Sequence, residues 1–196
     1  MLKSPAESIS SFSIGSHAGT IYCKKINIYK NPIQSINDAA LDRVILNAKK
    51  QGVIADGKTI VTEALQRLVD ECAENGGGVV YLQDGIYLSG TLELKENVTL
   101  YIETDAVLKG VLDINAYPTQ ISENNPNWNM LVKGLQKSLV YADGKRNIRI
   151  IGGGTIDGSG DFEGPYGTES YRPCAILLVD CDNAKICDLY VKDAGM

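Results

Sequence analysis

The pattern of apolar and polar positions changes once along the chain, at the glycines that follow Asn75. Before them, between Thr59 and Glu74, apolar residues recur three and four positions apart, which predicts one face of an amphipathic helix. That face consists of Ala64, Leu65, Leu68, Val69 and Cys72. After the glycines, short apolar runs separated by glycine or polar breaks predict strands. These runs are Val79–Leu82, Ile86–Leu88, Thr91–Leu94, Val98–Ile102 and Ala106–Leu108.

A repeated unit underlies this strand-rich part of the chain. Each unit has an apolar strand, a polar turn with an asparagine, a second strand, a turn and a third strand. The leading strands are Leu92–Leu94, Leu139–Tyr141 and Ile176–Val179, and the asparagines that follow them are Asn97, Asn147 and Asn183. Repeats of this kind without helices between them predict an all-β solenoid, in which each coil covers the apolar inside of its neighbour.

Two longer segments, 111–138 and 158–174, interrupt the repeat and are interpreted as loops that leave the coils. Such loops commonly build the binding face of a solenoid. The helix at 59–74 directly precedes the first strand, so we expect it to cap the N-terminal end, where strand edges and core would otherwise be exposed. No comparable segment follows the last strand. We therefore expect a chain truncated at its C-terminus, whose uncapped last coil favours self-association.

Residues 1–50 carry the weakest pattern and are interpreted as an N-terminal extension. It contains a β-prone run at Ile26–Tyr29 and a predicted helix at Asn37–Lys50, within which Val44–Leu46 is also a candidate strand. Residues 51–196 are predicted to form the N-terminal coils of one β-helix domain, which agrees with a chain of 196 residues.

Composition narrows the function. A net charge of −5 gives no broad basic surface, which argues against nucleic acid and against a basic membrane patch. The first residues contain no apolar signal-peptide core, so we expect a cytoplasmic protein, or a secreted or periplasmic one if the sequence lacks its leader. Five cysteines without a CxxC pair predict reduced, mostly buried thiols and no zinc site.

Several segments, in the same order, resemble glycoside hydrolase family 28, the polygalacturonases and rhamnogalacturonases. They are 56–59, 76–90, 94–101, 106–110, 113–118, 152–158 and 171–173, the fourth being Ala-Val-Leu-Lys-Gly and the sixth Gly-Gly-Gly-Thr-Ile-Asp-Gly. The resemblance implies a right-handed parallel β-helix of the pectin lyase-like type with an N-terminal capping helix. It also implies a pectic poly- or oligosaccharide substrate, inverting hydrolysis of galacturonosyl linkages and no cofactor or metal.

Inverting hydrolysis needs a protonated carboxyl and a second carboxylate that activates water. In the family these carboxylates come from Asn-Thr-Asp and Asp-Asp motifs, supported by Gly-His-Gly and Arg-Ile-Lys motifs. None of the four occurs here, and the only histidine, His17, lies in the extension. We therefore expect the catalytic coils to lie beyond Met196, this chain alone to be inactive and its catalytic residues to be unknown.

Three charged or aromatic residues in the matched region still need a role. Asp157 suits a structural turn, because a short carboxylate can accept hydrogen bonds from nearby amides. Tyr171 and Arg172 adjoin a loop and are substrate-binding candidates, since a guanidinium there could pair with a galacturonate carboxylate. Arg172 could equally tie the loop to a coil.

Rival functions rest on other patterns. Gly52–Thr59 fits the phosphate-binding loop motif and is followed by a helix, and Ile176–Asp180 resembles a magnesium-binding strand. The residues before Gly52 are not a buried strand, however, and no crossover helices follow Glu74, so we interpret the segment as a turn and helix start. A serine hydrolase is also disfavoured, because the sequence contains no Gly-x-Ser-x-Gly elbow. An inactive or carbohydrate-binding β-helix remains the alternative function.

Overall fold

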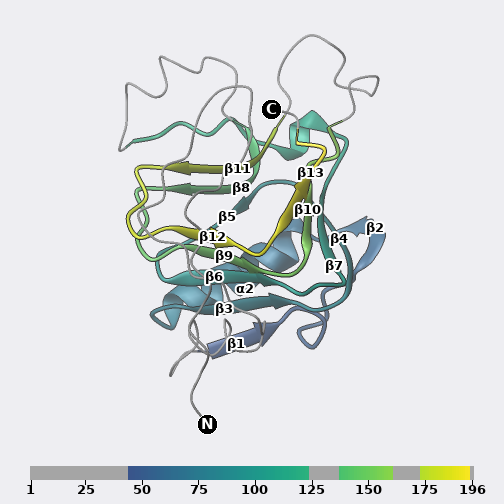
Figure 1. Cartoon of the computed structure of the whole chain (residues 1–196), viewed down its shortest axis with the longest axis horizontal. Helices are drawn as coiled ribbons and strands as arrows, with labels where there is room; N and C mark the ends of the chain where they lie inside the picture. The colour runs from purple at the N-terminus through teal and green to yellow at the C-terminus, as the bar shows by residue number, and fades with distance from the viewer. Residues whose placement is uncertain (1–43, 124–136, 161–172, 195–196) are drawn as a thin grey trace, which may run out of the picture.

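The computed structural model describes residues 44–123, 137–160 and 173–194. In these residues every strand pairs in parallel, and the strands form three sheets that run along the same axis (Figure 1). The first sheet contains β1 (Val44–Asn47), β3 (Gly78–Leu82), β6 (Val98–Ile102), β9 (Arg149–Gly152) and β12 (Lys185–Cys187). The second contains β2 (Asp56–Ile60), β4 (Gly85–Ser89), β7 (Ala106–Gly110), β10 (Thr155–Asp157) and β13 (Tyr190–Lys192). The third contains β5 (Leu92–Glu93), β8 (Ser138–Asp143) and β11 (Cys174–Val179).

The chain visits the three sheets in turn, first, second and third, and then begins the next coil. Each strand therefore pairs with the strand one coil earlier and one coil later, as in β3, β6 and β9. This is the predicted parallel β-helix. The predicted strands are confirmed with shifts of one or two residues at most of their ends, and Val98–Ile102 is observed unchanged.

The core of the solenoid is a set of stacked apolar rows. One row joins Val80, Leu100 and Ile150 in register across the first sheet, and all three side chains are fully buried. Tyr87, Leu108 and Ile156 form the corresponding row in the second sheet. Burying a side chain of this size stabilises the fold by about 1.5–3 kcal/mol, so the rows hold successive coils together.

The helix α2 (Thr62–Glu74) replaces a strand of the third sheet in the first coil. Its predicted face is confirmed, because Leu65, Leu68, Val69 and Cys72 are buried in the core, although Ala64 is only half-buried. The Gln66 side chain pairs with the backbone of Glu93 in β5, donating to its carbonyl at 3.0 Å and accepting from its N–H at 2.9 Å. The side-chain amide thus satisfies the edge of β5 as a neighbouring strand would.

Two predictions near the N-terminus are wrong. Residues Val44–Asn47, part of the predicted helix Asn37–Lys50, form β1 and pair with β3; residues 37–43 lie outside the described part. Thr59 is not a helix start, because Asp56–Ile60 is the edge strand β2 and pairs with β4. The first strand of the solenoid within the described residues, β1, thus lies inside the segment assigned to the extension.

The three repeated asparagines form a ladder at the corner between the third and first sheets. Asn97, Asn147 and Asn183 all have left-handed backbone conformations, with φ of 63°, 58° and 53°. Asn147 donates from Nδ2 to Asn97 Oδ1 at 2.7 Å, and Asn183 donates in the same way to Asn147 at 2.7 Å. Asparagine tolerates this conformation better than most residues, so the turn and the ladder use the same side chain.

Gly152 ends β9 with φ of +135°, which side chains rarely allow. A Cβ atom there would overlap the backbone carbonyl of Ile102 in the coil below. Glycine is thus required at this contact between the two coils.

Of the cysteines within the described residues, none is in a disulfide. Cys72 is buried, whereas Cys174, Cys181 and Cys187 are only half-buried, so the prediction of mostly buried thiols is wrong for these three. No helix in the described part of the chain is long and apolar enough to cross a membrane.

Candidate functional site

The longest connections of the solenoid all lead to one sheet. Residues 111–137 and 158–173 each leave the second sheet and enter a strand of the third, β8 or β11. Connections between the third and first sheets and between the first and second are short. Because long loops on a regular scaffold commonly carry binding residues, the outer face of the third sheet is the candidate functional site.

The floor of this site is a row of outward-facing side chains. Glu93 of β5, Tyr141 of β8 and Leu177 of β11 lie in register across the sheet. Asp143 and Val179 form the next outward row. Tyr141, Leu177 and Val179 form an apolar cluster separate from the core of the solenoid. The site therefore combines an aromatic and apolar cluster, whose side chains are at most 9% exposed, with two carboxylates. Apolar and aromatic groups beside a few polar ones are a common composition for a ligand-binding site.

Both carboxylates at the site are engaged by neighbouring groups. Asp143 accepts hydrogen bonds from the Ser122 hydroxyl at 2.8 Å and from the Glu123 N–H at 3.3 Å. Glu93 forms an ion pair with Lys95 at 2.7 Å. These contacts hold Ser122 and Glu123 of the first long connection against β8, and they place the Lys95 ammonium beside β5.

The same connection is attached at the other end of the strands. Gln120 donates to Thr91 Oγ1 at 3.2 Å, and the Thr91 hydroxyl donates to the Ser138 carbonyl at 2.7 Å. The Lys137 ammonium donates to the carbonyl of Tyr117, whose own hydroxyl donates to the Val111 carbonyl at 2.8 Å. These hydrogen bonds attach the described residues of the connection to the third sheet.

Tyr141 has the clearest electrostatic perturbation at the site. Burial raises the pKa of its phenol to about 12, and the charges of Asp143 and Glu93 act in the same direction. The hydroxyl consequently stays protonated at neutral pH and can donate a hydrogen bond to an anionic ligand.

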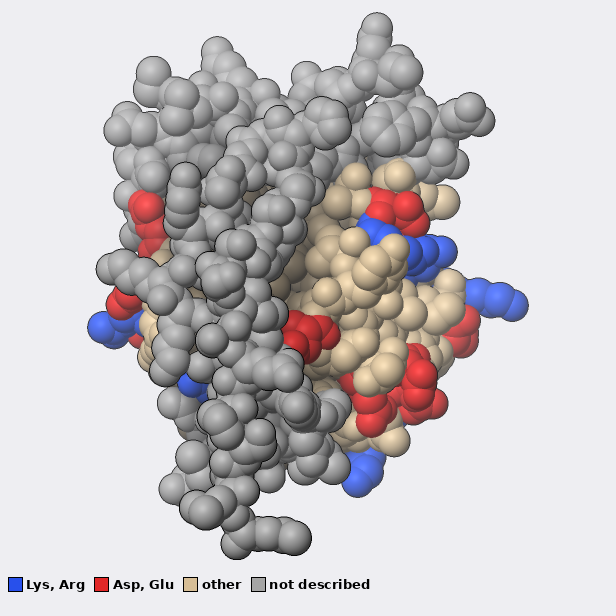
Figure 2. All heavy atoms as spheres, viewed as in Figure 1, with Lys and Arg blue, Asp and Glu red and all other residues tan. Residues whose placement is uncertain are grey.

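A groove of about 620 Å³ lies at the end of the third sheet where β5 passes into the asparagine corner. Asp70 and Glu74 of α2 line one side, and Lys95 and Lys145 line the other. Figure 2 likewise shows cations and anions intermixed on the described part of the visible face, rather than a surface of one sign. Lys95 thus belongs both to this groove and to the ion pair on the candidate site.

The predicted site residues Tyr171 and Arg172 lie outside the described residues, immediately before Pro173 and β11. Sequence reasoning did not find Glu93, Lys95, Tyr141 and Asp143. The signal was available in the outward positions of the leading strands, which become visible once inward residues have been assigned to the core.

Asp157 occupies the structural position expected of it. Its carboxylate accepts from the Ser159 N–H at 2.9 Å and pairs with Lys192 of the next coil at 3.0 Å. The side chain is only 7% exposed and belongs to the last residue of β10, where the second long connection begins. It ties two coils together.

The phosphate-loop interpretation is contradicted by Asp56. Its carboxylate accepts from the backbone N–H groups of Lys58 and Thr59, both at 2.8 Å, and from the Thr59 hydroxyl at 2.9 Å. These contacts lower the pKa of Asp56. The groups that would bind a phosphate are therefore occupied by a carboxylate of the same turn, and the segment continues as β2.

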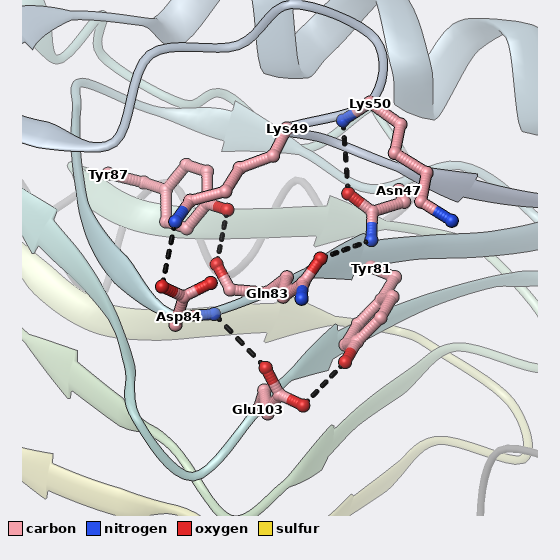
Figure 3. Close-up of polar contacts among 8 residues, drawn as sticks. All are labelled: Asn47, Lys49, Lys50, Tyr81, Gln83, Asp84, Tyr87 and Glu103. Carbon is pink, nitrogen blue, oxygen red and sulfur yellow. Dashed lines mark hydrogen bonds and ion pairs between the residues drawn. The ribbon is translucent and has the colours of Figure 1, made fainter.

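A second polar network lies at the corner between the first and second sheets (Figure 3). The Tyr81 hydroxyl donates to Glu103 at 2.6 Å, and the second oxygen of Glu103 accepts from the Asp84 N–H at 3.1 Å. Asp84 in turn pairs with Lys49 at 2.8 Å. Each carboxylate in this network bridges successive coils, so its role is to stack turns.

Two further contacts complete that corner, the first between coils and the second within one coil. Asn47 donates to the Gln83 side chain at 2.8 Å, and the Tyr87 hydroxyl donates to the Gln83 carbonyl at 2.5 Å. Within the described ranges, no three His, Cys, Asp or Glu side chains are grouped so as to hold a metal ion. The outer face of the third sheet remains the strongest candidate.

Comparisons with known proteins agree with this architecture. No protein-family profile matches the chain. It is 30% identical over 148 residues to an exo-poly-alpha-D-galacturonosidase of Dickeya chrysanthemi, covering 72% of this chain and 24% of that protein. It is 32% identical over 116 residues to a probable polygalacturonase of Vitis vinifera, covering 56% of this chain and 23% of that protein. The chain thus spans about a quarter of the length of these relatives.

Among solved structures, a hyperthermoactive exopolygalacturonase from Thermotoga maritima superposes with a TM-score of 0.64 at 21% identity, over 85% of this chain and 47% of that one. At this identity the likeness concerns the fold, which is the parallel β-helix observed here.

Proposed function

The chain is polygalacturonase-like, and from this premise we propose that it forms part of an enzyme that hydrolyses galacturonosyl linkages in pectic polysaccharide. The observation that carries the proposal is the 30% identity to an exo-poly-alpha-D-galacturonosidase over most of the chain. The parallel β-helix supports it, because two long connections lead into one sheet, and such loops commonly carry the binding residues of a solenoid.

We assign the described residues of the site to substrate binding rather than to catalysis. An inverting hydrolase needs one carboxyl that reaches the leaving oxygen and another that activates water. Glu93 and Asp143 are instead held by Lys95, Ser122 and a backbone amide. Tyr141, which stays protonated, and the cation of Lys95 suit the carboxylates of galacturonate. A carbohydrate-binding role of this chain therefore fits the described site.

Binding can be tested by calorimetry with oligogalacturonate and, as a neutral control, a malto-oligosaccharide of the same length. We expect only the acidic sugar to bind. Tyr141→Phe should weaken binding about fivefold, since one hydrogen bond contributes about 1 kcal/mol. Tyr190→Phe, on an exposed position of the second sheet, is the matched control and should change nothing. Equal losses in both variants, or none in either, would contradict the assigned site.

Hydrolysis is a separate measurement. Reducing-sugar release from polygalacturonate and rhamnogalacturonan should be compared for this chain and for the longest polypeptide that its reading frame encodes. We expect the longer polypeptide to release reducing sugar, and this chain to bind the polysaccharide without releasing any. Binding without release of reducing sugar by either polypeptide would favour the alternative, a carbohydrate-binding β-helix. The absence of both binding and release would overturn the proposal.

Self-association is proposed for the last described coil. Ile186 continues the core row of Ile150 and Val191 that of Ile156, yet each is 42% exposed, whereas Ile150 and Ile156 are fully buried. An apolar surface of this kind favours association with another chain. Light scattering should show a mass that rises with concentration and falls in Ile186→Lys; a monomer at all concentrations would contradict the proposal.

A further inference from the structure

The outer face of the first sheet is unexpectedly apolar. In β3, Val80 and Leu82 point into the core, so Val79 and Tyr81 point outward. Tyr81 lies in register with Tyr101 of β6, which is followed by Ile151 of β9 and Cys187 of β12. We name Val79, Tyr81, Tyr101, Ile151 and Cys187 the tyrosine face; they form a cluster separate from the solenoid core.

This face is also shielded from water. Val79, Tyr101 and Ile151 are only 0%, 2% and 1% exposed. All residues of β6 are buried, whereas in β7, the next strand along the chain, buried positions alternate with the half-buried outward residues Val107 and Lys109. A strand buried on both sides has a second layer of chain on its outer side.

The described elements do not supply that layer. Outside their own sheet, the elements in substantial contact with β3, β6 and β9 are α2 and β7. The buried side chains of α2 belong to the core cluster, hence to the inner side of the sheet. The strand β7 merely continues the coil after β6. The rings of Tyr81 and Tyr101, 5.4 Å apart and edge to face, therefore lie on a side of the sheet that none of these described elements covers.

The chain offers one segment that starts in the right place. Residues 1–43 join the solenoid at Val44, the first residue of β1, and β1 is the edge strand of this same sheet. Residues 124–136 and 161–172, by contrast, belong to connections between the second and third sheets. Crossing a few strands requires about 15–20 Å, which an extended chain covers in about six residues.

We propose that the tyrosine face is the docking site for residues 1–43 of the same chain. The segment covers the side of the solenoid formed by the first sheet. The inference is independent of pectin binding and of hydrolysis, so it stands or fails separately from the proposed function.

The test is photo-cross-linking in the full chain, with p-benzoylphenylalanine in place of Tyr101. Irradiation followed by peptide mass spectrometry should give cross-links to residues 1–43 within monomeric protein. The same probe in place of Ile86, which is exposed on the second sheet, is the matched control and should give none to that segment.

A second probe position guards against loss of folding. Cys187 is half-buried at the margin of the tyrosine face, so p-benzoylphenylalanine there leaves the core rows intact. Cross-links from either folded variant to residues 1–43 support the proposal. Cross-links to a second copy, to 124–136 or to 161–172, or no cross-link in either folded variant, would overturn it.

Discussion

The asparagine ladder allows the stability of a single coil corner to be worked out residue by residue. Asn147 is the middle rung: it donates to Asn97 and accepts from Asn183, both at 2.7 Å. Replacing it with alanine removes two hydrogen bonds, each contributing about 1 kcal/mol. It also leaves a side chain with no local hydrogen bond in a left-handed conformation, which costs about 1 kcal/mol. We therefore expect Asn147→Ala to lower the free energy of unfolding by about 3 kcal/mol.

Two further variants separate these contributions. Asn183 has nearly the same φ as Asn147, 53° against 58°, but makes one rung bond in the described structure. Asn183→Ala should therefore cost about 1 kcal/mol less than Asn147→Ala. Asn147→Gly removes the bonds but accepts the left-handed conformation, so it should recover about 1 kcal/mol relative to alanine.

The assay is equilibrium urea unfolding followed by far-ultraviolet circular dichroism, with free energies compared at a common slope. We expect the free energy of unfolding to be lowest for Asn147→Ala, higher for Asn183→Ala and Asn147→Gly, and highest for the wild type. Equal losses of stability in the two alanine variants would show that the second ladder hydrogen bond of Asn147 adds nothing to the free energy of unfolding. A glycine variant as stable as wild type would assign the whole effect to backbone strain and refute the ladder argument.

Three further predictions address the capping helix, the contact of Gly152 with the neighbouring coil and the candidate site. Gln66→Ala should cost about 2 kcal/mol in urea unfolding, because both backbone groups of Glu93 lose their partner; Arg67→Ala, on the exposed side of α2, should stay within about 0.5 kcal/mol of wild type. Gly152→Ala should abolish soluble folded protein, since its Cβ would overlap the Ile102 carbonyl, whereas Gly153→Ala meets chiefly the Thr104 side chain and should be recovered in soluble form. The pKa of Tyr141 is raised to about 12, so the folded state keeps a proton that the unfolded state loses above pH 10; its contribution to stability is complete below pH 10 and lost as pH rises toward 12. The stability difference between wild type and Tyr141→Phe should therefore be constant below pH 10 and shrink above it, and a constant difference up to pH 12 would contradict the assignment.

The repeat made the strand-rich part of the fold predictable, because inward positions such as Val80, Leu100 and Ile150 are apolar in successive coils. The edge strand β2 was missed for the opposite reason. Its sequence, Asp-Gly-Lys-Thr-Ile, is polar and largely exposed, and only pairing with β4 makes it a strand. Likewise β1 lies in a helix-like stretch and is fixed by β3. Tertiary pairing, rather than local preference, decides both.

The candidate site was less predictable than the fold. Glu93 is far in sequence from Tyr141 and Asp143, and only the register of β5 with β8 brings the three onto one surface. No local motif marks such residues, because outward positions of a solenoid strand are free to be polar anywhere along the repeat. Tyr171 and Arg172, chosen from a motif, stay predictions.

The pairing of Gln66 with Glu93 has a consequence for how such proteins can change over evolution. Because the helix supplies both hydrogen bonds that the first strand of the third sheet needs, the start of the stack does not depend on how many coils come later. Successive rungs of the ladder are 50 and 36 residues apart, and the larger spacing contains the longer loop. Duplication, loss or elongation of a coil beyond the helix therefore leaves the cap and its register unchanged. Descendants of one ancestor could differ widely in length and loop content while keeping the same N-terminal end.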